Sequence, residues 1–313
     1  MTTTTRTVFE QYQVRKTKRQ KTAFIDYVTR VATEQGYSVQ VEKSALGARN
    51  IVVGDLEKAK VVYTAHYDTC AALPFPNLIT PKNFPLYLLY QLVITAVILA
   101  VMFGLIWLVQ TALAPLNLLP RTLYFVRLAV MLIVLLALFN GPANKHTAND
   151  NTSGVTVLLD VMAALSAEQR EQAAFVFFDL EESGTLGSMS FKRKHKQTMC
   201  EKLLINFDCV SDGDTMLMVL KKKAVPFRAV LEAAFPTTDA VKAEIVDHGV
   251  FYPSDQAWFP CGVGVAALKR TKKRGILYMD RIHTNRDTVY REENIAYLTQ
   301  GAVALVSQLQ EEA

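Results

Sequence analysis

Apolar positions are unevenly distributed along the chain, and they gather in two long stretches before its midpoint. Residues 86–109 are 24 consecutive positions without a charge, and residues 121–140 contain an unbroken apolar run at positions 128–139. As a helix, the first stretch would be about 36 Å long, which exceeds the roughly 30 Å hydrocarbon core of a bilayer. We therefore expect residues 84–140 to form a transmembrane helical hairpin, with two buried helices of a large soluble core as the alternative.

Outside the hairpin, short apolar runs alternate with segments of helical periodicity. Five runs have the length of strands and two segments have helical spacing: strands at 37–42, 50–53, 60–65, 173–178 and 203–207, and helices at 9–35 and 152–165. This alternation predicts an α/β fold with a mixed, largely parallel central sheet flanked by helices. Since the hairpin interrupts the pattern, we expect residues 1–83 and 141–313 to form a single discontinuous domain.

The distribution of charge indicates on which side of a membrane this domain lies. Lys and Arg residues lie almost entirely outside the hairpin, and its connector side offers only Arg121 and Arg127. The positive-inside rule therefore places both flanking parts in the cytoplasm, in a two-pass protein of the cell membrane. Residues 1–30 contain no apolar segment of the kind found in a signal peptide.

Composition excludes several classes of protein. Half of the residues are hydrophobic, which excludes a disordered chain. A net charge of +5 is mild for 313 residues and gives no case for a nucleic-acid partner. The four cysteines form no CxxC pair, so reduced thiols are expected rather than a disulfide framework.

Side chains that bind metals follow each of the predicted buried strands. His66 and Asp68 come directly after the first of them. Glu181 and Glu182 follow the second, and Asp208 follows the third. Taken singly, a strand-end Asp is better explained as a helix cap and the Glu pair as a solvated turn, and His66 could be a core histidine. Together they indicate a shared site, because the carboxyl ends of neighbouring parallel strands lie at one edge of a sheet.

The donor types at this edge favour a metal centre. Imidazole and carboxylate groups suit Zn²⁺ and its first-row neighbours. Carboxylates outnumber imidazoles, which is typical of two metals that share a bridging carboxylate. Cys70 lies close to His66 in the sequence, and we expect it to be a neighbour rather than a ligand.

The order of these motifs resembles metallopeptidase family 28, the di-zinc exopeptidase family of the bacterial leucyl-type aminopeptidases. The matching segments are HYD at 66–68, NDNTSG at 149–154, EESG at 181–184, Asp208 and IHTNRDT at 282–288. Glutaminyl cyclases, folate/glutamate carboxypeptidases and the inactive transferrin receptors also belong to that family. The resemblance covers most of the chain outside the hairpin and implies a zinc exopeptidase-like fold.

The resemblance also implies a role for each matching residue. Two Zn²⁺ would be bound, with other first-row divalent metals as alternatives. His66 and Asp208 would bind one ion, Glu182 and His283 would bind the other, and Asp150 would bridge both. Glu181 would act as general base and later as acid, while Asp68 would orient the His66 imidazole. Ser254 and Asp255 resemble the family's segment near the substrate pocket, and Asp287 matches a position in its last motif.

From this resemblance we expect a membrane-anchored aminopeptidase that hydrolyses the first peptide bond of substrates with a free amino terminus. The ligand set and the base are complete, which argues against an inactive relative. A carboxypeptidase or amidohydrolase on the same metals, and a non-catalytic membrane binding protein with a relict site, are the alternatives. The sequence does not predict the oligomeric state.

Two features depart from the family pattern. Asp68 and Asp150 are 82 positions apart, and the hairpin fills a gap that is usually brief. Gln256 stands where a histidine often follows the Ser-Asp pair. The second departure affects the expected pocket but removes no expected metal ligand.

Overall fold

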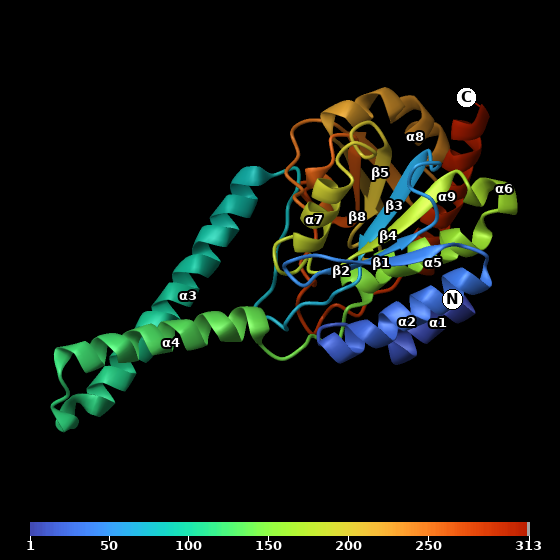
Figure 1. The fold of residues 1–313 in the computed structure, drawn as a ribbon. Helices are drawn as coiled ribbons and strands as arrows, with labels where there is room; N and C mark the ends of the chain where they lie inside the picture. Colours follow the sequence, from blue (N-terminus) through green and yellow to red (C-terminus); the bar gives the residue numbers. More distant parts are fainter. Residues whose placement is uncertain (312–313) are drawn as a thin grey trace.

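A mixed sheet of nine strands forms the centre of the domain in the computed structural model, which describes residues 1–311 (Figure 1). In sequence order the strands are β1 (Val39–Lys43), β2 (Arg49–Val53), β3 (Val61–His66), β4 (Ala173–Phe178), β5 (Leu203–Phe207), β6 (Thr215–Leu220), β7 (Lys242–Val246), β8 (Gly262–Arg270) and β9 (Leu277–Tyr278). Their spatial order is β1-β2-β4-β3-β5-β8-β6-β7, and β9 pairs with β8. The four central strands β4, β3, β5 and β8 run parallel, which confirms the predicted parallel core.

Helices cover both faces of this sheet, as expected for parallel strands. One face carries α1 (Thr3–Gln11), α2 (Lys18–Glu34), α5 (Gly154–Ala164), α8 (Arg228–Ala234) and α9 (Glu292–Glu311), and the other carries α7 (Leu186–Lys194), while the short α6 (Ala167–Arg170) precedes β4. Side chains of β3 alternate between the two faces: Val61 and Tyr63 pack in the larger core, and Val62 packs in the smaller one. Both faces of the central strands are therefore buried in apolar cores. A functional site on these strands is expected at the strand ends.

The predicted helix over residues 9–35 is wrong, because the chain breaks between α1 and α2. Thr17 caps α2 in a capping box with Gln20, which starts a new helix at Lys18. Arg15 lies in the break with no exposed surface, and its guanidinium donates to the backbone oxygens of Tyr67 and Tyr12. Arg15 is thus buried and hydrogen-bonded to the backbone just after β3, and it is not part of a solvated helix face.

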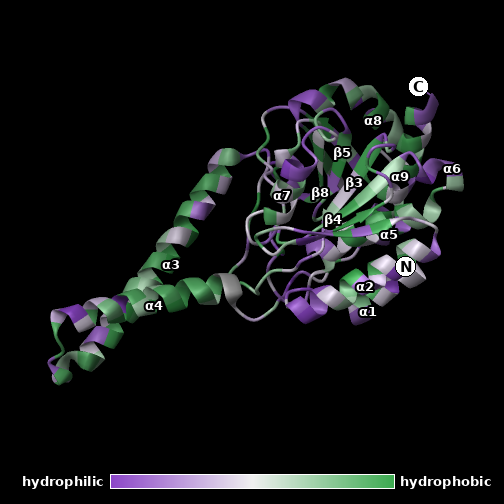
Figure 2. Cartoon of the chain, in the orientation of Figure 1, coloured by the Kyte–Doolittle hydropathy of each residue, from purple (hydrophilic) through white to green (hydrophobic). Residues whose placement is uncertain are grey.

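The inserted hairpin consists of α3 (Phe84–Leu113) and α4 (Pro120–Asn140), joined by a short connector. The helices project from the domain like the arms of a V, and Figure 2 shows apolar residues along most of both. Both are long and apolar enough to cross a membrane, and only 6% and 0% of their most apolar segments is buried. Within the described residues, neither helix is therefore buried in the core of the domain.

Candidate active site and metal centre

The carboxyl ends of three adjacent central strands bring the candidate residues together. His66 is the last residue of β3, which lies between β4 and β5. Glu181 and Glu182 follow β4, and Asp208 follows β5 directly. Strand order alone therefore places these side chains at one edge of the sheet.

Asp150 joins the two halves of the site. Its Oδ1 lies 3.2 Å from His66 Nε2, and its Oδ2 lies 2.9 Å from His283 Nε2. Asp208 Oδ1 approaches His66 Nε2 to 3.4 Å, and Glu182 Oε2 approaches His283 Nε2 to 3.2 Å. The five side chains thus form two clusters that share the Asp150 carboxylate.

The loop that carries Asp150 is held by buried polar contacts. Asp287 accepts the backbone N–H groups of Asn149 (2.7 Å) and Asp150 (3.0 Å). The Asn151 side chain donates to the Phe207 carbonyl at the end of β5 and accepts the backbone N–H of Gly154. These contacts position the loop, and through it Asp150.

Asp68 positions the neighbouring glutamates as well as the histidine. Its carboxylate accepts the backbone N–H groups of Glu181 (3.0 Å) and Glu182 (3.2 Å). His66 Nδ1 lies 3.1 Å from the Asp68 backbone oxygen and 3.6 Å from its carboxylate. The glutamate turn therefore depends directly on Asp68, while the imidazole contacts mainly its backbone.

Not every acidic residue at this edge points into the site. Asp179, directly after β4, pairs with Lys21 at 2.6 Å and accepts the backbone N–H of Arg49, so it ties α2 and β2 to the strand end. Ser254 donates to Asp208 Oδ2 at 2.6 Å, and Asp255 has no exposed surface. A role of Ser254 and Asp255 in substrate binding stays a prediction.

The charge balance of the site calls for cations. Five carboxylates (Asp68, Asp150, Glu181, Glu182 and Asp208) surround two imidazoles. Burial alone would lower the pKa of His283, but Glu182 and Asp150 outweigh it and raise the pKa to about 10. Burial raises the pKa of Glu182 to about 8 and that of Glu181 well above its usual range. Without a bound cation, the site therefore favours the protonated forms of His283, Glu181 and Glu182.

This donor set fits a metal pair. Three ligand groups, His66 with Asp150 and Asp208, approach one another closely enough to hold an ion. Glu182 Oε1 is buried and has no hydrogen-bond partner among the described residues. Nitrogen and oxygen donors of this kind match first-row divalent metals.

Cys70 is closer to the second cluster than the sequence indicated. Its thiol, Glu182 and His283 offer donor atoms within 4.8 Å of one another. Burial raises the pKa of this thiol, which keeps it protonated in the absence of a metal. Sequence proximity to His66 gave no sign that the thiol faces the opposite histidine.

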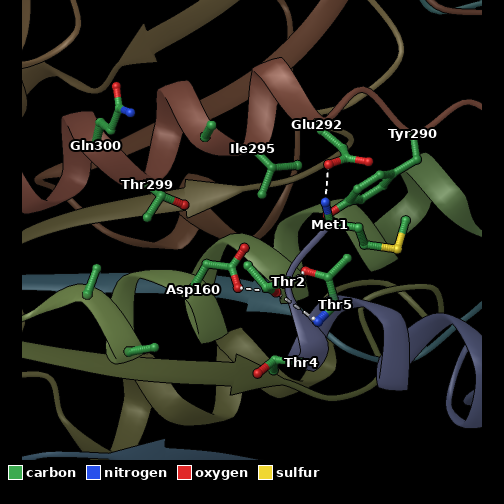
Figure 3. Close-up of a pocket in the computed structure, with 13 residues that line it drawn as sticks. Met1, Thr2, Thr4, Thr5, Asp160, Tyr290, Glu292, Ile295, Thr299 and Gln300 are labelled. Atoms are coloured by element: carbon green, nitrogen blue, oxygen red, sulfur yellow. Dashed lines mark hydrogen bonds and ion pairs between the residues drawn. The ribbon is translucent and has the colours of Figure 1, made fainter.

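Two adjoining cavities serve the site. A chamber of about 150 Å³ is lined by His66, Asp150, Glu181 and Asp208, among others. A vestibule of about 580 Å³ adjoins it, and His283 and Asn77 line both. A separate cavity of about 490 Å³ lies between the N-terminus, α5 and α9, where Thr2 bonds Asp160 (Figure 3); none of the candidate site residues lines it.

Comparison with known proteins agrees with this geometry. The family model described as "Peptidase family M28" matches residues 133–306, more than half of the chain. No curated protein matches the sequence. The matched segment includes Asp150, both glutamates, Asp208 and His283.

Solved structures show the same fold at low sequence identity. A Zn-dependent exopeptidase from Parabacteroides distasonis is 15% identical with a TM-score of 0.57, covering 97% of this chain and 96% of that one. A leucine aminopeptidase precursor from Bacteroides thetaiotaomicron is 14% identical with a TM-score of 0.57, covering 97% and 95%. A glutaminyl cyclase from Porphyromonas gingivalis is 16% identical with a TM-score of 0.54, covering 99% and 96%.

Proposed function

The chain belongs to peptidase family M28, and on that premise we propose that it is a membrane-anchored, zinc-dependent aminopeptidase. The observation that carries the proposal is the convergence of His66, Asp150 and Asp208 with Glu182 and His283 around shared carboxylate oxygens. A relict site would have no reason to keep every donor and the adjacent Glu181.

The residues divide between holding metal and moving protons. His66 and Asp208 would hold one Zn²⁺, Glu182 and His283 the other, and Asp150 both. Bound there, the metals would supply Lewis-acid chemistry, which lowers the pKa of water and polarises a carbonyl. Glu181 lines the same chamber, and its raised pKa suits a carboxylate that takes a proton from water and returns it to the leaving amine.

The excess of carboxylates favours cleavage at the amino terminus. With two Zn²⁺ bound, the five carboxylates still leave a small net negative charge, which favours a positively charged α-amine over a terminal carboxylate. Lys21, a cation on the vestibule wall, is already paired with Asp179. We therefore prefer an aminopeptidase to a carboxypeptidase.

The hairpin is the proposed membrane anchor. Two exposed apolar helices in water would be an aggregation liability, and a bilayer removes them from solvent. Because nearly all basic residues lie outside the hairpin, we place the catalytic domain on the cytoplasmic side.

Matched peptides test the activity in detergent-purified, zinc-loaded protein. We expect hydrolysis of a peptide with a free amino terminus and none of its N-acetylated twin. Glu181→Gln should lower turnover by about 10²–10⁴-fold, because a general base is lost, while its zinc content stays that of the wild type. Cleavage of the acetylated peptide from its carboxyl end, release of ammonia from glutaminyl peptides without hydrolysis, or unchanged turnover in the variant would each overturn the proposal.

A further inference from the structure

The vestibule beside the metal ligands has one wall that belongs to the hairpin. Asp68, Cys70, Glu182 and His283 line its inner end. Residues of both hairpin helices line its outer end. At about 580 Å³ it lies within the range of about 300–1,000 Å³ typical of ligand pockets. A molecule that fills the vestibule can therefore contact the candidate metal ligands and the hairpin at the same time.

Four hairpin residues of this wall share one face of α3. Gln91, Ile94, Thr95 and Ile98 follow the i, i+3, i+4, i+7 spacing of a helix face, and Leu138 faces them from α4. Further along the same helix the two arms meet, where Met102 and Ile106 are buried. The vestibule is therefore lined by α3 residues that precede this meeting point and by the end of α4.

Gln91 and Thr95 are isolated polar residues in the apolar span of α3, whose other amide and aliphatic hydroxyl side chains, Gln110 and Thr111, lie near its far end. Residues 86–109 contain no other side chain with an amide or aliphatic hydroxyl group. Neither side chain has a hydrogen-bond partner in the part of the chain that the structure describes. Polar residues in an apolar span are costly unless they face a polar cavity or a partner. Their presence at the vestibule indicates a ligand with its own hydrogen-bonding groups, such as a peptide backbone.

Specific contacts fix the hairpin against the domain. Phe251 packs against Phe84 and Tyr87 at the start of α3, with ring centroids 5.3 and 5.6 Å apart. Lys82, just before the helix, pairs with Glu244 at 2.6 Å. The Leu73 N–H, in the segment that leads to α3, donates to the His283 backbone oxygen at 2.7 Å. The hairpin is therefore held in a set orientation to the metal site.

We propose that the hairpin is part of the substrate-binding site, and that the substrate is a bilayer-associated peptide with apolar residues directly after its first residue. This inference rests on the proposed aminopeptidase function. The first residue occupies the chamber at the metal ligands, and the following residues extend into the vestibule. Gln91 and Thr95 bind the peptide backbone there, while Ile94, Ile98 and Leu138 contact its apolar side chains.

Photo-crosslinking in lipid nanodiscs tests the placement directly. The probe is an apolar peptide of about 20 residues, long enough to enter a bilayer, with a free amino-terminal leucine and a diazirine side chain at its third position. Full-length Glu181→Gln protein keeps the probe intact. We expect adducts within residues 91–98, suppressed by excess unlabelled peptide. Adducts confined to lipid or to lipid-facing residues, or insensitive to competitor, would overturn the proposal.

A kinetic comparison tests whether the contact matters for selection. The readout is the ratio of kcat/KM for the apolar peptide to kcat/KM for a short soluble peptide with the same first residues. Ile94→Trp, which fills the vestibule, should lower this ratio about tenfold, since lost apolar contacts discriminate by that order. Val93→Trp, on the exposed lipid side of α3, is the matched control and should leave the ratio unchanged.

The outcomes separate the two proposals. If the wild type cleaves neither peptide, the aminopeptidase function fails, and the inference falls with it. If the wild type cleaves both and Ile94→Trp leaves the ratio unchanged, the aminopeptidase stands and the role of the hairpin is refuted.

Discussion

Asp150 is the single side chain on which the site most depends. Each of its oxygens faces a different histidine, at 3.2 and 2.9 Å. Burial would raise the pKa of Asp150, yet His283 and His66 outweigh it and bring the pKa below its usual range. A carboxylate that stays ionised between two donors is suited to bridging two cations.

The residue-scale charges predict how pH acts on the metal-free protein. His283 has a pKa raised from 6.5 to about 10, so its stabilising charge is lost as pH rises through that range. Glu182 has a pKa raised from 4.5 to about 8, so its ionisation destabilises the fold as pH rises through that range. Both effects have the same sign, and stability should fall from about pH 5 to about pH 10.

Bound zinc replaces these protons, so its stabilising effect should grow with pH. Thermal unfolding with and without a chelator, at about pH 5.5 and about pH 8.5, measures this. We expect the chelator to lower Tm more at the higher pH. An equal drop at both values would show that these groups do not exchange protons for metal.

Individual site residues were predictable where a motif places them at a strand end, as for His66 and Asp208. The proximity of Cys70 to His283 was not predictable, because His283 belongs to a segment more than two hundred positions away. Arg15 was also misjudged, since a charged residue in a basic run gives no sign that tertiary contacts bury it.

Among elements, the buried strands were predicted best. The structure places β4 and β5 at the predicted residues and shifts β3 by one, because continuous apolar runs of strand length have few other solutions. The break between α1 and α2 was missed because residues on both sides keep helical spacing. The strands β6 to β9, which include the central β8, were not predicted at all.

The junction of β5 and α5 leaves no room for a side chain at Gly154. A Cβ at Gly154 would lie 2.2 Å from the Phe207 carbonyl and 2.5 Å from Asn151 Oδ1. Gly154→Ala should therefore destabilise the domain by about 1–3 kcal/mol through overpacking and reduce zinc content by moving the Asp150 loop. Unfolding and metal analysis measure both effects.

Gly104→Ala is the matched control, because no atom lies within 4 Å of its added Cβ in α3. It should leave the zinc content unchanged and should not lower stability, since alanine is a better helix former than glycine. If Gly154→Ala behaved like this control, the proposed coupling between the helix start and the metal loop would be wrong.

At the scale of the whole molecule, the sequence predicted a hairpin but not its direction. The two long apolar runs were evident from composition. The contacts at the base of the hairpin involve residues distant in the sequence, such as Phe251 and Glu244. Hydrophobic spacing along the chain does not predict such long-range contacts. That orientation makes the hairpin a wall of the vestibule as well as a proposed anchor.

The exposed cysteine gives a direct test of sidedness. Cys200 is exposed, whereas Cys70, Cys209 and Cys261 are buried. If the catalytic domain is cytoplasmic, a membrane-impermeant maleimide should label Cys200 only after permeabilisation, and Leu116→Cys in the exposed connector should be labelled in intact cells. The reverse pattern would contradict the proposed sidedness, and labelling of both in intact cells would contradict a spanning hairpin.

Zinc content tests the central claim most directly, namely that side chains from five separate segments meet around a pair of metals. Mass-spectrometric metal analysis of the full-length protein in detergent, loaded with zinc and then desalted, gives the stoichiometry per chain. We expect two equivalents in the wild type and a marked loss in Asp150→Asn, whose amide is a weaker bridge than a carboxylate. One equivalent or none in the wild type, or an undiminished content in Asp150→Asn, would contradict the account.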